Sequence, residues 1–161
     1  MTDHPTAPDW QVSQWFNADH APSLAALRGR VVVLHAFQML CPGCVLHAVP
    51  QAERIHQQFA GEGVAVIGLH TVFEHHNAMQ PVSLAAFLHE FRITHPVGVD
   101  ARRPGESLPQ TMQAYAMQGT PTLVLIDRAG RLRRQHFGQV DDMTVGREVM
   151  RLVAETAAED R

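Results

Sequence analysis

The feature that most constrains the fold is a Cys-Pro-Gly-Cys run at residues 41–44, which holds the only two cysteines of the chain. A continuous apolar run at residues 31–37 precedes this motif, and apolar residues recur at helical spacing over residues 45–59. These patterns predict a buried strand that leads into the motif and a helix that leaves it, with a kink at Pro50. The first cysteine would then lie at the N-terminus of a helix.

This arrangement gives the two cysteines a specific chemistry. Cys41 and Cys44 would be close enough for their sulfur atoms to form one disulfide. The unpaired N–H groups and the dipole at a helix N-terminus favour the thiolate form of Cys41. A reachable thiolate of low pKa beside a second thiol is what thiol–disulfide exchange requires. The order of strand, motif and helix therefore indicates this chemistry more strongly than the motif alone.

The cysteine pair could alternatively bind zinc, because zinc sites often use this spacing. Such a site usually has four ligands, and the chain contains no second Cys-x-x-Cys pair. The densest histidine group, His70, His75 and His76, does not have the spacing of a zinc finger. We therefore expect no metal at the cysteines and no cofactor beyond the redox-active pair. A transition metal held by these histidines together with Glu74 is an alternative.

Length and composition place the chain among globular proteins with one domain. Its 161 residues suffice for a full hydrophobic core, and 45% of them are hydrophobic while 18% are charged. The net charge of −3 and the absence of a long basic run argue against nucleic acid as a partner. No apolar run is long enough to span a membrane, and the first residues do not resemble a signal peptide. We therefore expect a cytoplasmic protein, where a paired Cys-x-x-Cys is more often catalytic than structural.

The rest of the chain alternates between strand and helix patterns. We expect a flexible N-terminal arm over residues 1–9 and one domain over residues 10–158. Strands are expected at residues 64–69, 96–100, 123–126 and 131–137, with a further edge strand or packed segment at 10–16. Helices are expected at residues 22–29, 83–92, 111–117 and 142–157, with Ser23 and Ser83 as N-caps. This order predicts an α/β fold, in which helices flank both faces of a central sheet.

Several of these segments resemble one known family. They are residues 23–30 before the valine-rich strand, the motif at 41–44, the run Gly-Thr-Pro-Thr at 119–122, and Phe-Gly at 137–138. Together they are similar to the thioredoxin-fold redoxins of the TlpA-like group, and the resemblance covers residues 10–155. It implies a thioredoxin-like central mixed sheet flanked by helices in a single domain.

The resemblance also implies an activity and roles for individual residues. The activity is that of a thiol–disulfide oxidoreductase, with a protein or a low-molecular-weight thiol or disulfide as partner and an unidentified upstream reductant. Cys41 would be the exposed attacking cysteine and Cys44 the buried resolving one. Pro121 would be a cis-proline that faces the disulfide, and Thr120 would offer its backbone to an extended partner.

Other positions near the motif depart from the family pattern. Leu40 stands where thioredoxin-like chains commonly carry tryptophan, and with Pro42 and Gly43 it is expected to contribute to the partner-binding surface. His35 occupies the position of a buried acid in thioredoxins and of an asparagine in many TlpA-like chains. It is a candidate proton acceptor for Cys44, or else a core histidine without a proton role. His47, in the helix that follows the motif, either faces the thiols or is solvated.

Two other functions remain as alternatives to the exchange enzyme. One is a peroxiredoxin-like thiol peroxidase, whose attacking cysteine also begins a helix. Peroxiredoxins carry threonine three residues before that cysteine, and this chain has Gln38 there. The other is a non-catalytic thioredoxin-like module that binds a partner or handles metal. The intact cysteine pair favours the exchange enzyme over both.

Overall fold

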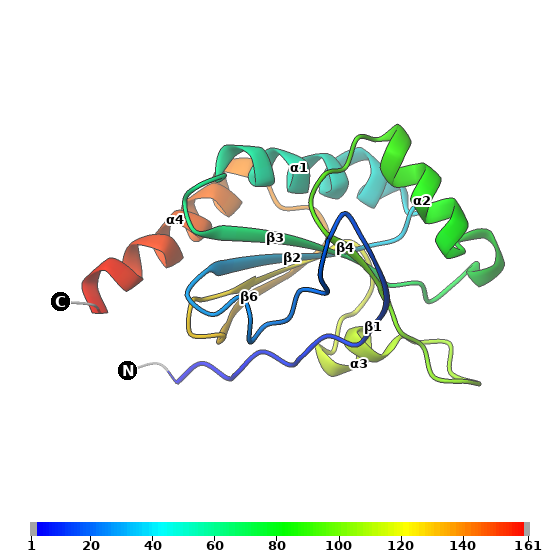
Figure 1. The fold of residues 1–161 in the computed structure, drawn as a ribbon, viewed down its shortest axis with the longest axis horizontal. Helices are drawn as coiled ribbons and strands as arrows, with labels where there is room; N and C mark the ends of the chain where they lie inside the picture. The colour runs from blue at the N-terminus through cyan, green and yellow to red at the C-terminus, as the bar shows by residue number, and fades with distance from the viewer. Residues whose placement is uncertain (1–2, 160–161) are drawn as a thin grey trace.

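The computed structural model describes residues 3–159 of the chain, in which one mixed sheet carries helices on both faces. Helices α1, α2 and α4 cover one face, and α3 lies on the other face together with the N-terminal segment (Figure 1). The strands lie in the order β1-β4-β3-β2-β5-β6. The elements are β1 (Val12–Phe16), β2 (Val31–Phe37), η1 (Cys44–Ala48), α1 (Val49–Gln58), β3 (Val64–His70), η2 (His76–Ala78), α2 (Pro81–Glu90), β4 (Val97–Asp100), α3 (Gln110–Ala114), β5 (Thr122–Ile126), β6 (Leu132–Phe137) and α4 (Asp142–Glu159). The expected α/β fold with a mixed central sheet is confirmed.

Strand β2 lies at the centre of the sheet, parallel to β3 and antiparallel to β5, and every residue in it is buried. Successive side chains of a strand point to opposite faces. Val31 and Val33 therefore pack with residues of α1 and α4, whereas Leu34 packs on the α3 side. His35 and Phe37 continue the face that α1 and α4 cover. The strand thus brings His35 beneath the helix that carries the cysteine motif.

The helix that follows the motif begins at Pro42 and contains a π-helical turn, η1, before it becomes α1. In this turn the N–H of Val49 donates to the carbonyl oxygen of Cys44. Pro50 is the second residue of α1 and has no N–H to donate back into the π-helical turn that precedes it. The structure thus has a π-helical turn just before Pro50, an irregularity of the kind at which helices bend.

Residues 22–29 form a series of turns and not the expected helix. Ser23 still acts as a local cap, because its hydroxyl accepts a 3.1 Å hydrogen bond from the N–H of Ala26. Gly29 ends the segment with a φ of +89°, a conformation that glycine adopts at little cost. The turn chemistry was therefore readable from the sequence, but the segment is too short to form a regular helix.

Helix α2 begins at Pro81, two residues earlier than expected. Ser83 consequently lies inside the helix and is not its N-cap, a role that falls to Gln80. The fixed φ of proline suits the first helical turn. This preference decides the start of the helix here, so the prediction from the serine was wrong.

Part of the expected N-terminal arm packs against the domain. The N–H of Ala7 donates to the carbonyl oxygen of Gly130 at 2.9 Å, and the N–H of Leu132 donates to that of Pro5 at 2.8 Å. Ala7 is buried in the core cluster on the α3 face. Residues 1 and 2 of the expected arm lie outside the described residues.

Candidate active site

Cys41 and Cys44 lie together at the start of the helix that leaves β2. The backbone N–H of Cys44 donates to the sulfur of Cys41 over 3.3 Å. Both cysteines are free thiols; Cys41 is half-buried, whereas Cys44 is completely buried. An amide N–H at a helix start stabilises negative charge on a sulfur atom. Cys41 is therefore the cysteine that a partner can reach and the one whose sulfur the helix start stabilises.

The thiol of Cys44 is held in its protonated form. Burial raises the pKa of Cys44 to about 12, and the hydrogen bond with Cys41 adds to this effect. At neutral pH a thiol with such a pKa is almost entirely protonated and is a poor nucleophile. Any reaction in which Cys44 attacks therefore needs a group that accepts its proton.

The loop before β5 lies against the cysteine motif, although about eighty residues separate them in the sequence. The thiol of Cys41 donates to the carbonyl oxygen of Thr120 at 3.6 Å, and the Thr120–Pro121 peptide bond is cis, as the resemblance implies. A Cβ atom placed on Gly43 would lie 3.5 Å from Cδ of Pro121. The structure thus brings together the cysteine motif and the two loop residues that the sequence pointed to.

Gln38 also belongs to this site. The sequence pointed to it only because peroxiredoxins have threonine at this position. Its side chain is buried, and its amide nitrogen donates to the hydroxyl of Thr120 at 3.3 Å. Its amide oxygen accepts a 3.2 Å bond from the N–H of Phe73. Gln38 therefore links the end of β2 to two loops around the motif. A polar residue that continues an apolar strand was the only available signal.

The histidines considered as metal ligands have different surroundings. His70 is buried, and its Nε2 accepts a 3.2 Å hydrogen bond from the N–H of Met39. Burial lowers the pKa of His70 to about 4, so its ring is neutral at physiological pH. His76 contacts the carbonyl oxygen of Ser107 at 3.1 Å. Among the side chains that the structure describes, no group of three is suited to hold a metal ion.

Three exposed apolar side chains lie in segments near the motif: Leu40 precedes Cys41, Leu46 lies in η1, and Phe137 of β6 pairs with Thr122 of β5. Leu40, Leu46 and Phe137 are 57%, 68% and 55% exposed. Leu40 was expected here from the sequence, whereas Leu46 and Phe137 were not identified as binding residues. Exposed apolar side chains around a reactive thiol can contact the apolar parts of a docked partner.

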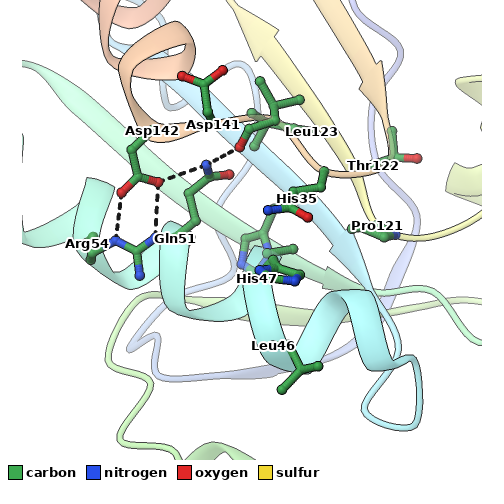
Figure 2. A pocket seen from close by; sticks show the side chains of 14 residues that line it. His35, Leu46, His47, Gln51, Arg54, Pro121, Thr122, Leu123, Asp141 and Asp142 are labelled. Atoms are coloured by element: carbon green, nitrogen blue, oxygen red, sulfur yellow. Dashed lines mark hydrogen bonds and ion pairs between the residues drawn. The ribbon is translucent and has the colours of Figure 1, made fainter.

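A cavity of about 260 Å³ lies between the motif helix and the start of β5 (Figure 2). At one end Arg54 forms two 3.0 Å hydrogen bonds with Asp142, and Gln51 donates to the same carboxylate at 3.0 Å. His35, His47 and Pro121 line its other parts, together with neighbouring residues of β5 and of the loop before α4. The cavity therefore reaches from a charged rim to the proline that faces Cys41.

His35 is buried in the wall of this cavity and is neutral. Its ring stacks on Phe37 with the ring centroids 5.2 Å apart, and its Nε2 lies 2.8 Å from Nε2 of His95. Burial, with a further contribution from His95, holds the pKa of His35 well below the usual histidine value. Its Nδ1 has no hydrogen-bond partner among the described residues. Nε2 of His35 thus has a partner inside the protein, whereas Nδ1 has none among the described residues and is available for a hydrogen bond.

The redoxin family model matches residues 6–149 of the chain. Among curated relatives, protein DipZ of Mycobacterium tuberculosis is 30% identical over 139 residues, which cover 84% of this chain and 19% of DipZ. The thiol-disulfide oxidoreductase ResA of Halalkalibacterium halodurans is 24% identical over 131 residues, covering 81% of this chain and 66% of ResA. The chain thus spans about a fifth of DipZ and just under two thirds of ResA. No helix within residues 3–159 is both long and apolar enough to cross a membrane.

Two solved structures are similar to this chain over nearly its whole length. A thioredoxin-like superfamily protein is 54% identical with a TM-score of 0.89, and the match covers 92% of this chain and 96% of that one. A thiol-disulfide isomerase from Corynebacterium glutamicum is 49% identical with a TM-score of 0.86, covering 91% of this chain and 96% of that one. The chain therefore belongs to the redoxin family and has the thioredoxin fold.

Proposed function

We propose that this protein catalyses thiol–disulfide exchange through Cys41 and Cys44, with a protein or a small thiol or disulfide as partner. The observation that carries the proposal is the pairing of a reachable Cys41, whose sulfur accepts the N–H of Cys44 at 3.3 Å, with a buried Cys44. The printed names of the ResA relative and of the C. glutamicum structure, a thiol-disulfide oxidoreductase and a thiol-disulfide isomerase, support it.

The reaction would proceed in two displacements. The thiolate of Cys41 attacks one sulfur of the partner disulfide, the partner S–S bond breaks, and its other sulfur leaves as a thiolate. Cys44 then loses its proton and attacks the sulfur of Cys41 in the mixed disulfide. The second partner thiolate leaves, and a Cys41–Cys44 disulfide remains. Two electrons have passed to the partner, and the reverse sequence oxidises a dithiol.

The partner would dock on the surface around Cys41. The backbone of Thr120, whose carbonyl oxygen lies 3.6 Å from the sulfur of Cys41, would pair with an extended segment, as when a peptide adds a strand to a sheet edge. Leu40, Leu46 and Phe137 would contact apolar side chains of that segment. This combination favours an unfolded or extended protein segment, although a small disulfide could also reach Cys41.

His35 is the proposed proton acceptor for Cys44 in the second displacement. Its neutral ring with an available Nδ1 is the form that can take a proton. Both residues pack around Phe37, on which His35 stacks and beside which Cys44 is buried. A water in the cavity could carry the proton between them.

Single cysteine variants test the proposal directly. With a disulfide-containing protein such as insulin, Cys44→Ser should accumulate a mixed disulfide that dissociates on reduction, whereas Cys41→Ser should form none and show no turnover. Mass spectrometry under non-reducing conditions distinguishes the two. Equal adduct formation by both variants, or turnover by Cys41→Ser, would contradict the assigned roles.

A further inference from the structure

We propose that Glu53, His95 and His35 form a buried proton relay between the active-site cavity and the protein surface. The inference rests on the proposed function, because the relay would serve the proton that Cys44 releases. Two contacts define it: Oε1 of Glu53 lies 2.7 Å from Nδ1 of His95, and Nε2 of His95 lies 2.8 Å from Nε2 of His35. Both imidazole rings are fully buried.

The hydrogen bonds fix which nitrogen of each ring carries a proton. An ionised carboxylate only accepts, so Nδ1 of His95 must donate to Glu53. In a neutral ring, Nε2 of His95 is then an acceptor, and Nε2 of His35 must donate to it. The remaining nitrogen of a neutral His35, Nδ1, therefore carries a lone pair. It is the buried atom without a partner among the described residues, in the ring that lines the cavity.

The surroundings of Glu53 and His95 favour an ionised carboxylate and neutral imidazole rings. Burial lowers the pKa of His95, although Glu53 acts in the opposite direction. Partial burial would raise the pKa of Glu53, but hydrogen bonds from the N–H groups of Thr94 and His95 and from the His95 ring lower it overall. Glu53 is thus ionised while both rings are neutral. Its side chain is 12% exposed, so this end of the relay touches solvent.

Gly68 of β3 lies against the contact between the two rings, where a side chain would not fit. A Cβ atom at this position would lie 2.9 Å from Nε2 of His35 and 3.4 Å from Nε2 of His95. The glycine has an ordinary backbone conformation, so no turn or positive φ requires it. Any larger residue would push into the contact between the rings. Strand β3 therefore has no side chain at the position where His35 and His95 meet.

Proton transfer through the relay can be written atom by atom. Nδ1 of His35 takes the proton that leaves the thiol of Cys44, while the Nε2 proton of His35 passes to Nε2 of His95. The Nδ1 proton of His95 passes to the carboxylate of Glu53, which releases it to solvent. No electrons move in these steps. The two rings are left as the opposite tautomers. They return to their first form in the reverse reaction, when Cys44 leaves as a thiolate and takes the proton from Nδ1 of His35 while solvent reprotonates the other end through Glu53.

Other titratable groups face this relay and must be kept constant in a test. His56 of α1 lies near His95, with ring centroids 5.8 Å apart. Across the cavity from His35 lie His47 and Arg54 of the motif helix and two carboxylates at the start of α4, Asp141 and Asp142. The test therefore changes Glu53 alone, at the end remote from the cavity.

The tautomers can be observed without any reaction. In the reduced wild-type protein labelled with ¹⁵N-histidine, long-range proton–nitrogen NMR spectra at pH 7 should show His35 protonated at Nε2 and bare at Nδ1. His95 should show the reverse pattern. A His35 ring protonated at Nδ1, or a doubly protonated His95, would overturn the proposed relay.

The kinetic test uses the Glu53→Gln variant, which keeps an oxygen acceptor but removes the charge. Reaction with one equivalent of the coloured disulfide 5,5′-dithiobis(2-nitrobenzoate) releases one thiolate when Cys41 attacks and a second when Cys44 resolves. The second phase should slow about tenfold or more at pH 7, since a positioned proton acceptor contributes roughly 10²- to 10⁴-fold. The first phase should be unchanged. The deficit should shrink at high pH, where hydroxide removes the proton.

Glu90→Gln is the matched control, because Glu90 is exposed at the end of α2 and its replacement changes net charge equally. It should leave both phases at the wild-type rate. An unchanged second phase in Glu53→Gln, or a loss that is the same at every pH, would overturn the relay while leaving the exchange reaction intact. Absence of the first phase in the wild-type protein would instead contradict the proposed function.

Discussion

The backbone N–H of Cys44 points at the sulfur of Cys41 from 3.3 Å, while the thiol of Cys44 itself is completely buried. Cys44 thus donates a hydrogen bond to the sulfur of Cys41 while its own thiol is kept out of solvent. Only Pro42 and Gly43 separate the two cysteines in the sequence, yet their environments are opposite. This asymmetry determines which sulfur a partner meets first.

The asymmetry predicts selective alkylation. At limiting iodoacetamide and pH 7, Cys41 should be modified first, and the rate at Cys44 should be lower by about 100-fold or more because burial and a high pKa both protect it. Peptide mapping by mass spectrometry gives the two rates. Unfolding in guanidinium should remove the difference. Faster labelling of Cys44 in the folded protein would reverse the assignment of attacker and resolver.

The space at Gly68 predicts a loss of stability when it is filled. Gly68→Ala should lower the free energy of unfolding by about 1–3 kcal/mol, because the added methyl group would overlap the His35 ring and Val97, whose nearest atoms lie 2.9 Å from its position. Urea denaturation measures the change.

Gly146→Ala is the matched control for that experiment, since it lies within α4 and its Cβ would meet nothing within 4 Å. It should stabilise the protein by up to about 1 kcal/mol through helix propensity. Equal effects of the two substitutions on the free energy of unfolding would contradict the predicted overlap at Gly68.

The neutral buried His70 predicts a pH-dependent stability. Its folded-state pKa of about 4 lies below the unfolded value of about 6.5, so the unfolded chain binds the extra proton first as pH falls. The contribution of the neutral His70 ring to the free energy of unfolding is complete above about pH 6.5. As the pH falls towards 4, up to about 3 kcal/mol of it is lost. His35 and His95 act in the same direction, because their pKa values are also lowered.

The His70→Gln variant isolates this contribution, because glutamine does not titrate and can still accept the N–H of Met39. Its free energy of unfolding, measured in urea between pH 7.5 and 5, should fall less steeply than that of the wild type. Parallel curves for the two proteins would contradict the assignment of His70 as a buried neutral ring.

The exposed apolar surface predicts a dependence on partner size. Phe137→Ser should slow exchange with a protein disulfide about tenfold, as one lost hydrophobic contact is worth roughly 1.5 kcal/mol. It should leave exchange with a small disulfide nearly unchanged. Met143→Ser, at a side chain that is 86% exposed on α4, is the control and should affect neither reaction. A similar loss with both substrates would mean that Phe137 acts on the site itself.

The sequence predicted the parts of the fold that local patterns determine. The apolar run of β2, the turn between β5 and β6, and the helical spacing after the motif all matched the structure in type and nearly in extent. Local rules competed at the start of α2, where the preference of Pro81 for a first turn prevailed over the capping tendency of Ser83. Such competition limits how well helix ends can be predicted.

The site was only partly predictable, because some of its contacts join distant segments. Cys41, Cys44 and the Thr-Pro pair stood out through their motifs. His35 was noted by its position, but its partner His95 lies sixty residues further along, and Glu53 contacts His95 from α1. Neither partner forms part of a motif, and only the packing of α1 and of the segment before β4 around β2 and β3 brings them together. Such pairings follow from tertiary packing and leave no local signal.

The central claim is that Cys41 and Cys44 form one reversible redox couple, and an equilibrium titration tests it most directly. The protein would be equilibrated in glutathione buffers of graded potential, quenched in acid and weighed by mass spectrometry. The account predicts a monomer that loses both thiol hydrogens in a single two-electron transition and regains them on reduction. Thiols that persist under oxidising conditions, or oxidation only to disulfide-linked dimers, would contradict it.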